Sequence, residues 1–426
     1  MTPRTLFAAA RRWFWRALWV FVLLSSLAGS TVYLEETHQL ARRFTRSVEF
    51  DFFGWTVQTL GIKYGQFSLG TTGYLDEADQ SALVLEYMDH LGQAQFLEGR
   101  LAEIYGDPSL DNPTGEAEEI AALFVEERAR LAELQPVVEA ILAEQASVVI
   151  SELGLNVGGS VFPPVAFHFS PIPSAMIVSP RDVIRQDANV QLDPDLTLEQ
   201  KIDLETTVEQ ALDVSVLVVP IGGYGTFPTM IMETTALTWL TDTIVHEWTH
   251  NFLTLRPLGW NYGATPEMRT MNETTASIAG REIGRMILER YYPDRVPPPP
   301  QPVDPDAPEP PPPAFDFRAE MHETRIHVDE LLAEGRIEEA EAYMEARRQI
   351  FWNEGYRIRR LNQAYFAFYG AYADEPGGPA GEDPVGEAVR ELWARIQSPK
   401  EFLLQMGGLH NYAELDELLG RMPASP

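Results

Sequence analysis

The sequence contains no cysteine and only eight histidines among its 426 residues. Disulfide bonds, thiolate metal sites and cysteine nucleophiles are therefore excluded. A transition-metal site in this chain has to be built from histidine and carboxylate side chains. Because histidine is so scarce, any two histidines at a metal-binding spacing are candidates for such a site.

Positive charge is also scarce, because 32 basic residues face 63 acidic ones and the net charge is −31. A field of this sign repels phosphate backbones, so nucleic acid is not expected as a partner. The acidity most simply keeps the surface soluble, and the alternative is that it steers cationic substrates. Apolar residues make up 45% of the chain, which is enough for a buried core.

The N-terminal segment is basic and then loses all charge. Residues 17–34 contain no charged side chain and follow four arginines within the first 16 residues. Eighteen residues just reach the length needed to cross a hydrocarbon core of ~30 Å. We therefore predict a single-pass membrane anchor with the bulk of the chain outside the cytoplasm. The small residues Ala28, Gly29 and Ser30 also resemble a signal-peptide cleavage site, so secretion after cleavage is the alternative.

Two long helices are predicted at residues 76–105 and 114–152, where apolar residues recur at steps of three and four. The segment between them is dense in turn-forming residues, so a helical hairpin is expected. Pro136 lies inside the second pattern and predicts a kink or a break there. The preceding residues 47–67 are aromatic and irregular, and they either lie on the membrane surface or pack under the next unit.

The pattern changes after about residue 160, where short runs rich in β-branched and aromatic residues are bounded by Pro and Gly. These runs predict strands at 165–169, 174–179, 214–219 and 226–232, with a helix at 197–212 between them. The most apolar helix is expected at about 235–254, followed by a loop at 255–270 and a helix to about 291. We predict an α+β fold, mostly helical, in which a small mixed β-sheet packs on the helix at 235–254.

His246-Glu247-Trp248-Thr249-His250 is an HExxH motif inside this apolar helix. Residues four apart lie about 40° apart around a helix axis, so both imidazoles can share one metal ion. Glu247 is rotated by about 100° from His246, which puts it beside the metal, where it can take a proton from a bound water. Zinc lowers the pKa of such a water to about 7, so a carboxylate suffices as the base.

The alternative for this motif is a pair of core histidines that happen to lie one turn apart. Buried polar groups in an apolar helix need partners, and a metal ion would satisfy both imidazoles at once. A catalytic zinc site needs a third protein ligand, and the best candidate is Glu273 in the helix after the loop. Thr270 and Glu273 also match a capping box, but Thr265-Pro266 offers an earlier helix start that leaves Glu273 free inside the helix.

Other histidines are weaker candidates for a metal site. His322 and His327 flank Glu323 in a similar pattern, but they are five residues apart, hence about 140° apart on a helix. They cannot both face one ion without a bulge, so we interpret them as surface residues. His168 stands alone in a predicted strand and is interpreted as a packed residue.

Residues 244–250 and 272–274 together resemble the gluzincin metallopeptidases, in which an Asn-Glu helix follows HExxH after about two dozen residues. Within that group the chain is most similar to the bacterial predicted aminopeptidases, over roughly residues 160–420, with weaker support from 323–335 and 361–364. The resemblance implies zinc, peptide hydrolysis and a sheet whose edge strand lies over the active helix. By position that strand would be 226–233, able to pair with an extended peptide.

The sequence also departs from this family. Some relatives carry an aspartate four residues after the ligand glutamate, where it orients a histidine, and here that position is Ser277. Asp242, one turn before His246, is a candidate substitute. An oxyanion donor besides zinc is needed as well. Candidates from the C-terminal helices are Tyr365, Tyr369, Tyr372 and His410.

These patterns divide the chain into five segments. They are a basic N-terminal segment with the membrane anchor or signal peptide (1–46), a helical hairpin region (47–158), a metallopeptidase core (159–296), a proline-rich insertion (297–314) and a C-terminal helical region (315–426) that completes the catalytic domain. Within the last segment, residues 317–373 and 384–420 are predicted to be helical. The proline tract favours an extended conformation that cannot join a packed core.

The sequence therefore predicts a membrane-anchored zinc peptidase that acts on peptides or proteins. His246, His250 and Glu273 are expected to hold one Zn²⁺ ion, with Glu247 as the general base, whereas exopeptidase action is implied only by the family resemblance. Two alternatives stay open. One is a membrane-tethered, non-enzymatic helical scaffold with a structural or vestigial metal site, and the other is hydrolysis of a non-peptide amide at the same site.

Overall fold

The computed structural model describes residues 36–106, 110, 112–298, 315–375 and 377–423. The predicted anchor at residues 17–34 and most of the proline-rich tract fall outside these ranges. The described part is mostly helical and carries small β-sheets, which confirms the α+β class.

Among the described residues, one helix (Pro113–Glu152) is long and apolar enough to span a membrane by length and composition. Half of its apolar window is buried inside the protein.

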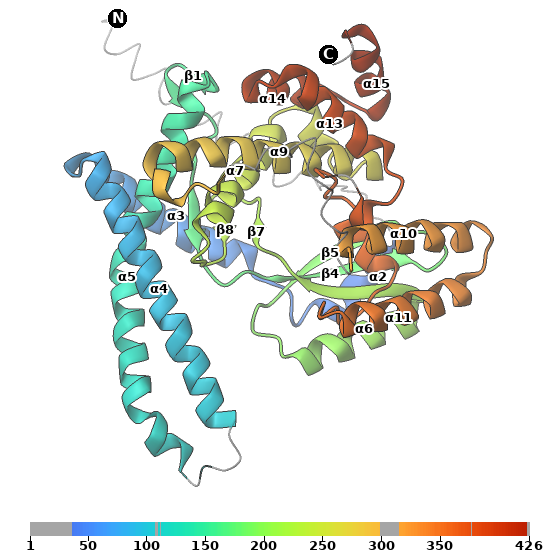
Figure 1. Cartoon of the computed structure of the whole chain (residues 1–426), viewed down its shortest axis with the longest axis horizontal. Helices are drawn as coiled ribbons and strands as arrows, with labels where there is room; N and C mark the ends of the chain where they lie inside the picture. Colours follow the sequence, from blue (N-terminus) through green and yellow to red (C-terminus); the bar gives the residue numbers. More distant parts are fainter. Residues whose placement is uncertain (1–35, 107–109, 111, 299–314, 376, 424–426) are drawn as a thin grey trace, which may run out of the picture.

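The predicted hairpin is present as α4 (Glu77–Gly106) and α5 (Pro113–Glu152), which project from the rest of the molecule (Figure 1). Of the kink or break predicted at Pro136, the break is wrong, because α5 continues through this residue. Proline removes one helical hydrogen bond. Leu134 and Val138, on either side of it, are buried in the main hydrophobic cluster and hold the helix in place.

Residues 47–67 are not irregular as predicted, because most of them form α3 (Phe52–Leu69), which packs against α5. The side chain of Asp51 caps the first turn by accepting a hydrogen bond from the Gly54 amide at 2.9 Å. Gly70 ends the helix in the left-handed conformation. At the start of α3, the Phe52 ring lies 5.0 Å from the ring of Tyr224.

One sheet consists of three antiparallel strands in the order β5-β4-β6. Its strands are β4 (Ser174–Pro180), β5 (Ala188–Leu192) and β6 (Val214–Pro220). Met176 in the central strand pairs with Val190 on one side and Val218 on the other. Helices α2 (Glu36–Thr45) and α6 (Leu198–Leu212) cover one face, and α12 (Gln363–Tyr369) covers the other. The strand β5 was not predicted, because Asn189 and Gln191 interrupt its apolar residues.

The second sheet is the small mixed one, and it packs on α7 (Leu237–Thr254). Its strands are β3 (Phe167–Phe169), β7 (Gly223–Tyr224) and β8 (Thr229–Ile231), with β8 parallel to β3 and antiparallel to β7. The predicted edge strand at 226–233 is therefore wrong, since β8 lies in the centre. The edge strands are β3 and β7, and β7 forms because the glycine-rich segment 222–225 leads the chain alongside β8.

Helix α9 (Pro266–Tyr291) follows the short helix α8 (Pro257–Trp260). Thr265 caps α9 by accepting a hydrogen bond from the Met268 amide, which confirms the predicted start and places Glu273 inside the helix. Residues of α4, α5, α7 and α9 share one hydrophobic cluster with the last three helices. The core of the molecule is thus built around α7 and α9.

The C-terminal region is helical, but less continuously than predicted. Its helices are α10 (Phe317–Ala333), α11 (Ile337–Asn353), α12, α13 (Pro384–Ile396), α14 (Pro399–Gly407) and α15 (Tyr412–Arg421). Residues 354–362 are not helical, and Gly355 adopts a positive φ just after α11 ends. The remaining short elements are the β1–β2 hairpin (Asn156–Val157 and Ser160–Val161) and 3-10 turns at Thr71–Tyr74, Pro293–Arg295 and Gly378–Ala380.

A buried ion cluster joins α3, α5 and β3 around Glu139. Its carboxylate lies 2.5 Å from Lys63 Nζ and accepts hydrogen bonds from His168 Nδ1 at 2.9 Å and the Phe169 amide at 2.8 Å. Burial opposes ionisation of Glu139, but His168 and Lys63 outweigh it and lower its pKa to about 2. His168 is thus a packed residue, as predicted.

We predict that Glu139→Gln destabilises the protein by about 3 kcal/mol or more at pH 7, because Lys63 is left buried without its counter-charge. The carboxylate contributes stability above its unfolded pKa of about 4.5, and this contribution is lost as the pH falls toward about 2. Urea denaturation should therefore show a difference between wild type and variant that shrinks between pH 5 and pH 3. The exposed Glu133→Gln is the control, and an equal effect of both would contradict the role of Glu139.

Candidate metal centre

Two glycines allow α7 and α9 to approach closely. A Cβ atom at Gly280 would lie 2.7 Å from the Asp242 carbonyl oxygen and 3.2 Å from His246 Cβ. A Cβ atom at Gly284 would lie 2.9 Å from the Asp242 amide nitrogen. Larger residues would therefore push the helices apart. On another side of α7, the buried Trp248 donates a hydrogen bond to the Pro163 carbonyl at 2.8 Å and anchors the helix.

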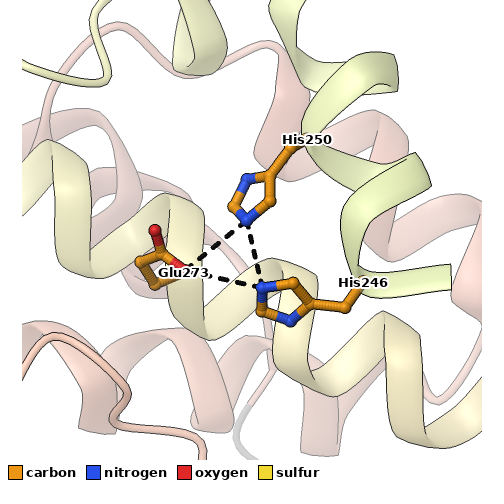
Figure 2. A group of neighbouring side chains, drawn as sticks. All are labelled: His246, His250 and Glu273. Carbon is orange, nitrogen blue, oxygen red and sulfur yellow. Dashed lines mark hydrogen bonds and ion pairs between the residues drawn. The ribbon is translucent and has the colours of Figure 1, made fainter. Parts of the chain in front are cut away.

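The close approach brings the three predicted ligands together. His246 and His250 project from α7, and Glu273 meets them from α9 (Figure 2). The two Nε2 atoms are 3.0 Å apart, and each lies 3.5 Å from Glu273 Oε2. One ligand atom from each residue lies within 4.8 Å of the others, so the group can hold a metal ion. Both imidazoles are mostly buried and Glu273 is almost fully so.

Neighbouring side chains fix the orientation of two of the ligands. Asn272 donates from Nδ2 to the Leu258 carbonyl at 3.4 Å, so its Oδ1 faces His250 and accepts from Nδ1 at 2.8 Å. This leaves the Nε2 lone pair of His250 available to a metal. Tyr262 donates to Glu273 Oε1 at 2.5 Å. The other carboxylate oxygen, Oε2, is buried without a hydrogen-bond partner and faces the two imidazoles, as a metal ligand would.

His246 is held more loosely than the other two. The Oγ atom of Ser277 lies 3.5 Å from His246 Nδ1, at the limit of a hydrogen bond. The ring of Tyr372 stacks over His246 with centroids 6.4 Å apart. Asp242, the candidate substitute for the missing aspartate, is instead directed at the backbone of Gly284. Burial raises the pKa of Asp242 to about 7.

The charges within the group favour a cation at its centre. Burial lowers the pKa of His250, but the carboxylate of Glu273 reverses this and raises the pKa to about 9. Burial likewise opposes the ionised form of Glu273, yet the two imidazoles hold its pKa well below the ordinary value. The imidazole of His250 and the carboxylate of Glu273 thus stabilise each other in the charged form. A metal cation would stabilise the ionised carboxylate in the same way.

Glu247 lies beside the three ligands and under the backbone of β7. It is buried, and burial raises its pKa although the two imidazoles act in the opposite direction. A Cβ atom at Gly223 would lie 2.5 Å from Glu247 Oε1, and one at Gly225 would lie 3.3 Å from Oε2. Gly223 in the edge strand and Gly225 just after it therefore make room for this carboxylate, which takes the position expected of a base.

The group opens into a cleft of about 930 Å³ between the two sheets and helices α7 and α9. Tyr369 and Tyr372 line this cleft, as two of the four candidate oxyanion donors. Tyr365 instead packs beneath, with its ring 4.5 Å from that of Tyr369. His410 is exposed and pairs with Glu414, so it is not part of the site.

The prediction that His322 and His327 are surface residues is confirmed in part. His322 and His327 both lie on α10, away from the cleft lining. His327 is exposed and pairs with Glu330, as a surface residue does. His322 is half-buried, so the interpretation as a surface residue is wrong for it. The reason is that two residues five apart on a helix face different sides.

Sequence reasoning missed Tyr262 and assigned no role to Asn272. Tyr262 stands in an irregular loop, where no periodicity marks a functional residue. Asn272 directly precedes Glu273 on the helix, so its position beside the ligand was the one available signal. The contribution of Gly223 and Gly225 depends on how β7 folds back over α7, which local patterns do not encode.

Comparison of the chain with protein-family models, curated proteins and solved structures finds no match. The function therefore has to be argued from the residues and their geometry.

We predict that Gly280→Ala destabilises the protein by about 1–3 kcal/mol and weakens metal binding, because the new methyl group separates α7 from α9. Gly99→Ala is the matched control, since its Cβ atom meets nothing within 4 Å on α4. It should stabilise the protein by about 0.5–1 kcal/mol. Thermal unfolding with and without added zinc measures both effects, and an unchanged zinc-dependent stabilisation in Gly280→Ala would contradict the expectation.

Proposed function

We propose that the protein is a zinc-dependent peptidase of the gluzincin type. The observation that carries this proposal is the placement of Glu273 Oε2 at 3.5 Å from both imidazole Nε2 atoms. Nitrogen and oxygen ligands at 2.0–2.1 Å from a tetrahedral zinc ion are separated by about 3.3 Å. The donor set of two histidines and one glutamate is also that of known catalytic zinc sites.

Zinc and the residues around it have separate roles in the proposed reaction. Zinc, when bound, polarises a carbonyl oxygen and lowers the pKa of a water molecule to about 7. Glu247 accepts the proton of the attacking water and delivers it to the leaving amine. Asn272 and Tyr262 keep an imidazole and the ligand carboxylate in position, which preserves the metal site during turnover.

The cleft supports a peptide as the substrate. Its volume of about 930 Å³ accommodates several residues, and the edge strand β7 offers backbone groups to an extended chain. Tyr372 is the best placed of the candidate oxyanion donors, because it lines the cleft and its ring stacks on His246. We further propose that residues 17–34 tether the protein to a membrane, with the cleft outside the cytoplasm.

The alternative of a scaffold with a structural metal site is less well supported. A structural zinc site is usually closed by a fourth protein ligand. Here the three ligands lie at the wall of an open cleft, and Glu247 lies next to them. A structural site has no use for a buried carboxylate at that position.

We predict that Glu247→Gln retains zinc but loses peptide hydrolysis by about 10²–10⁴-fold, because proton transfer is removed while the ligands stay in place. Glu273→Gln should lose both zinc affinity and activity. Zinc content by atomic emission and chelator-sensitive cleavage of a mixed peptide library provide the measurements.

The control for both variants is Glu323→Gln, which changes the exposed glutamate of the similar motif on α10. It should leave zinc content and hydrolysis unchanged. Full activity of Glu247→Gln would overturn its assignment as the base. Zinc binding without any hydrolysis by the wild-type chain would favour the scaffold.

A further inference from the structure

The outward face of α3 is an apolar stripe without charge. Five residues spaced alternately by four and three positions form it, and each is between 44% and 81% exposed. They are Phe53, Val57, Leu60, Tyr64 and Phe67. Such spacing places them on one side of the helix. Isolated exposed apolar residues are ordinary, but a continuous stripe of five marks an interaction surface.

On the inward side of the same helix, the half-buried Phe52 and Trp55 lie beside polar side chains. Thr59 and Lys63 are buried, and Lys63 is the single charged residue of α3. Its ammonium group is held by Glu139 at 2.5 Å and by Gln66 at 2.8 Å. The single charge of α3 is thus paired inside the protein, while Phe53, Tyr64 and Phe67 face outward.

A second copy of the chain fits this stripe poorly. A helix that pairs with another helix usually carries charged residues beside its apolar seam, which fix the partner and the register. Here the positions beside the stripe include Gln58, Gly61, Gly65 and Ser68. None of these positions carries a charge that could fix a partner helix or its register.

A lipid surface fits the stripe well. Phe and Tyr side chains favour the boundary between headgroups and acyl chains. An uncharged helix face can enter this layer without removing any charged group from water. The uncharged segment 17–34 ends 18 residues before Phe52. Arg43 and Arg46, between that segment and α3, are exposed and complement anionic headgroups.

We propose that α3 lies flat in the interfacial layer of a lipid bilayer, with the side chains from Phe53 to Phe67 directed into it. This contact is separate from the predicted anchor, and it does not depend on the proposed peptidase activity. The buried pair of Lys63 and Glu139 then holds α3 to α5, so the membrane contact is transmitted rigidly to the rest of the protein.

The absence of cysteine makes a direct test simple, because one introduced cysteine can be labelled uniquely. Leu60→Cys and Leu123→Cys form a matched pair, since the two leucines are 44% and 46% exposed on α3 and on the projecting part of α5. Each full-length variant is labelled with a polarity-sensitive fluorophore and reconstituted into vesicles of phosphatidylcholine and phosphatidylglycerol. Nitroxide-bearing lipids and aqueous iodide then serve as quenchers.

The label at position 60 should emit at shorter wavelength and be quenched several-fold more by the nitroxide lipids than by iodide, whereas the label at position 123 should show the opposite preference. A second variant, Val57→Glu with Leu60→Cys, should shift position 60 toward iodide quenching while its circular dichroism stays native. Iodide quenching at position 60 equal to that at 123 would overturn the proposal. Protection from both quenchers, or a disulfide between copies when the unlabelled Leu60→Cys variant is oxidised in air, would assign the stripe to a protein partner and overturn it equally.

Discussion

The close packing of α7 against α9 is the constraint on which the candidate site depends. HExxH supplies two ligands from one helix, but a third ligand has to arrive from another helix at a distance that ordinary side chains would prevent. Gly280 and Gly284 remove that obstacle by placing the backbone of α9 against Asp242 and His246. Glu273, two turns before Gly280 on the same helix, then reaches the two imidazoles.

The ligands could be predicted from the sequence because the information is local. Two histidines four apart share a helix face whatever the rest of the fold does. Thr265 and Pro266 mark a helix start, and this start places Glu273 in the helix interior. The groups around the candidate ligands were harder to find. Tyr262 reaches Glu273 from an irregular loop, and Gly223 and Gly225 approach Glu247 from a different segment of the chain.

The fold shows the same division between local and distant information. The hairpin of α4 and α5 follows from periodicity, and the apolar strands β4 and β6 stand out by composition. Strand β5 was missed because Asn189 and Gln191, which line the cleft, are polar, and α3 was missed because its glycines and aromatic residues do not follow the usual amphipathic pattern. Lys63 and Glu139 are 76 positions apart, so nothing local indicates that Lys63 turns inward.

The ring contact between Phe52 and Tyr224 connects α3 to the strand above Glu247. If α3 rests in the headgroup layer, this contact ties the strand at the wall of the cleft to the lipid surface. If the proposed peptidase activity holds as well, the polypeptides that reach the cleft are those close to the bilayer. The protein and a membrane-bound substrate would then meet by diffusion in the plane of the bilayer. The orientation of the cleft would select substrates by their distance from the membrane before any side chain is recognised.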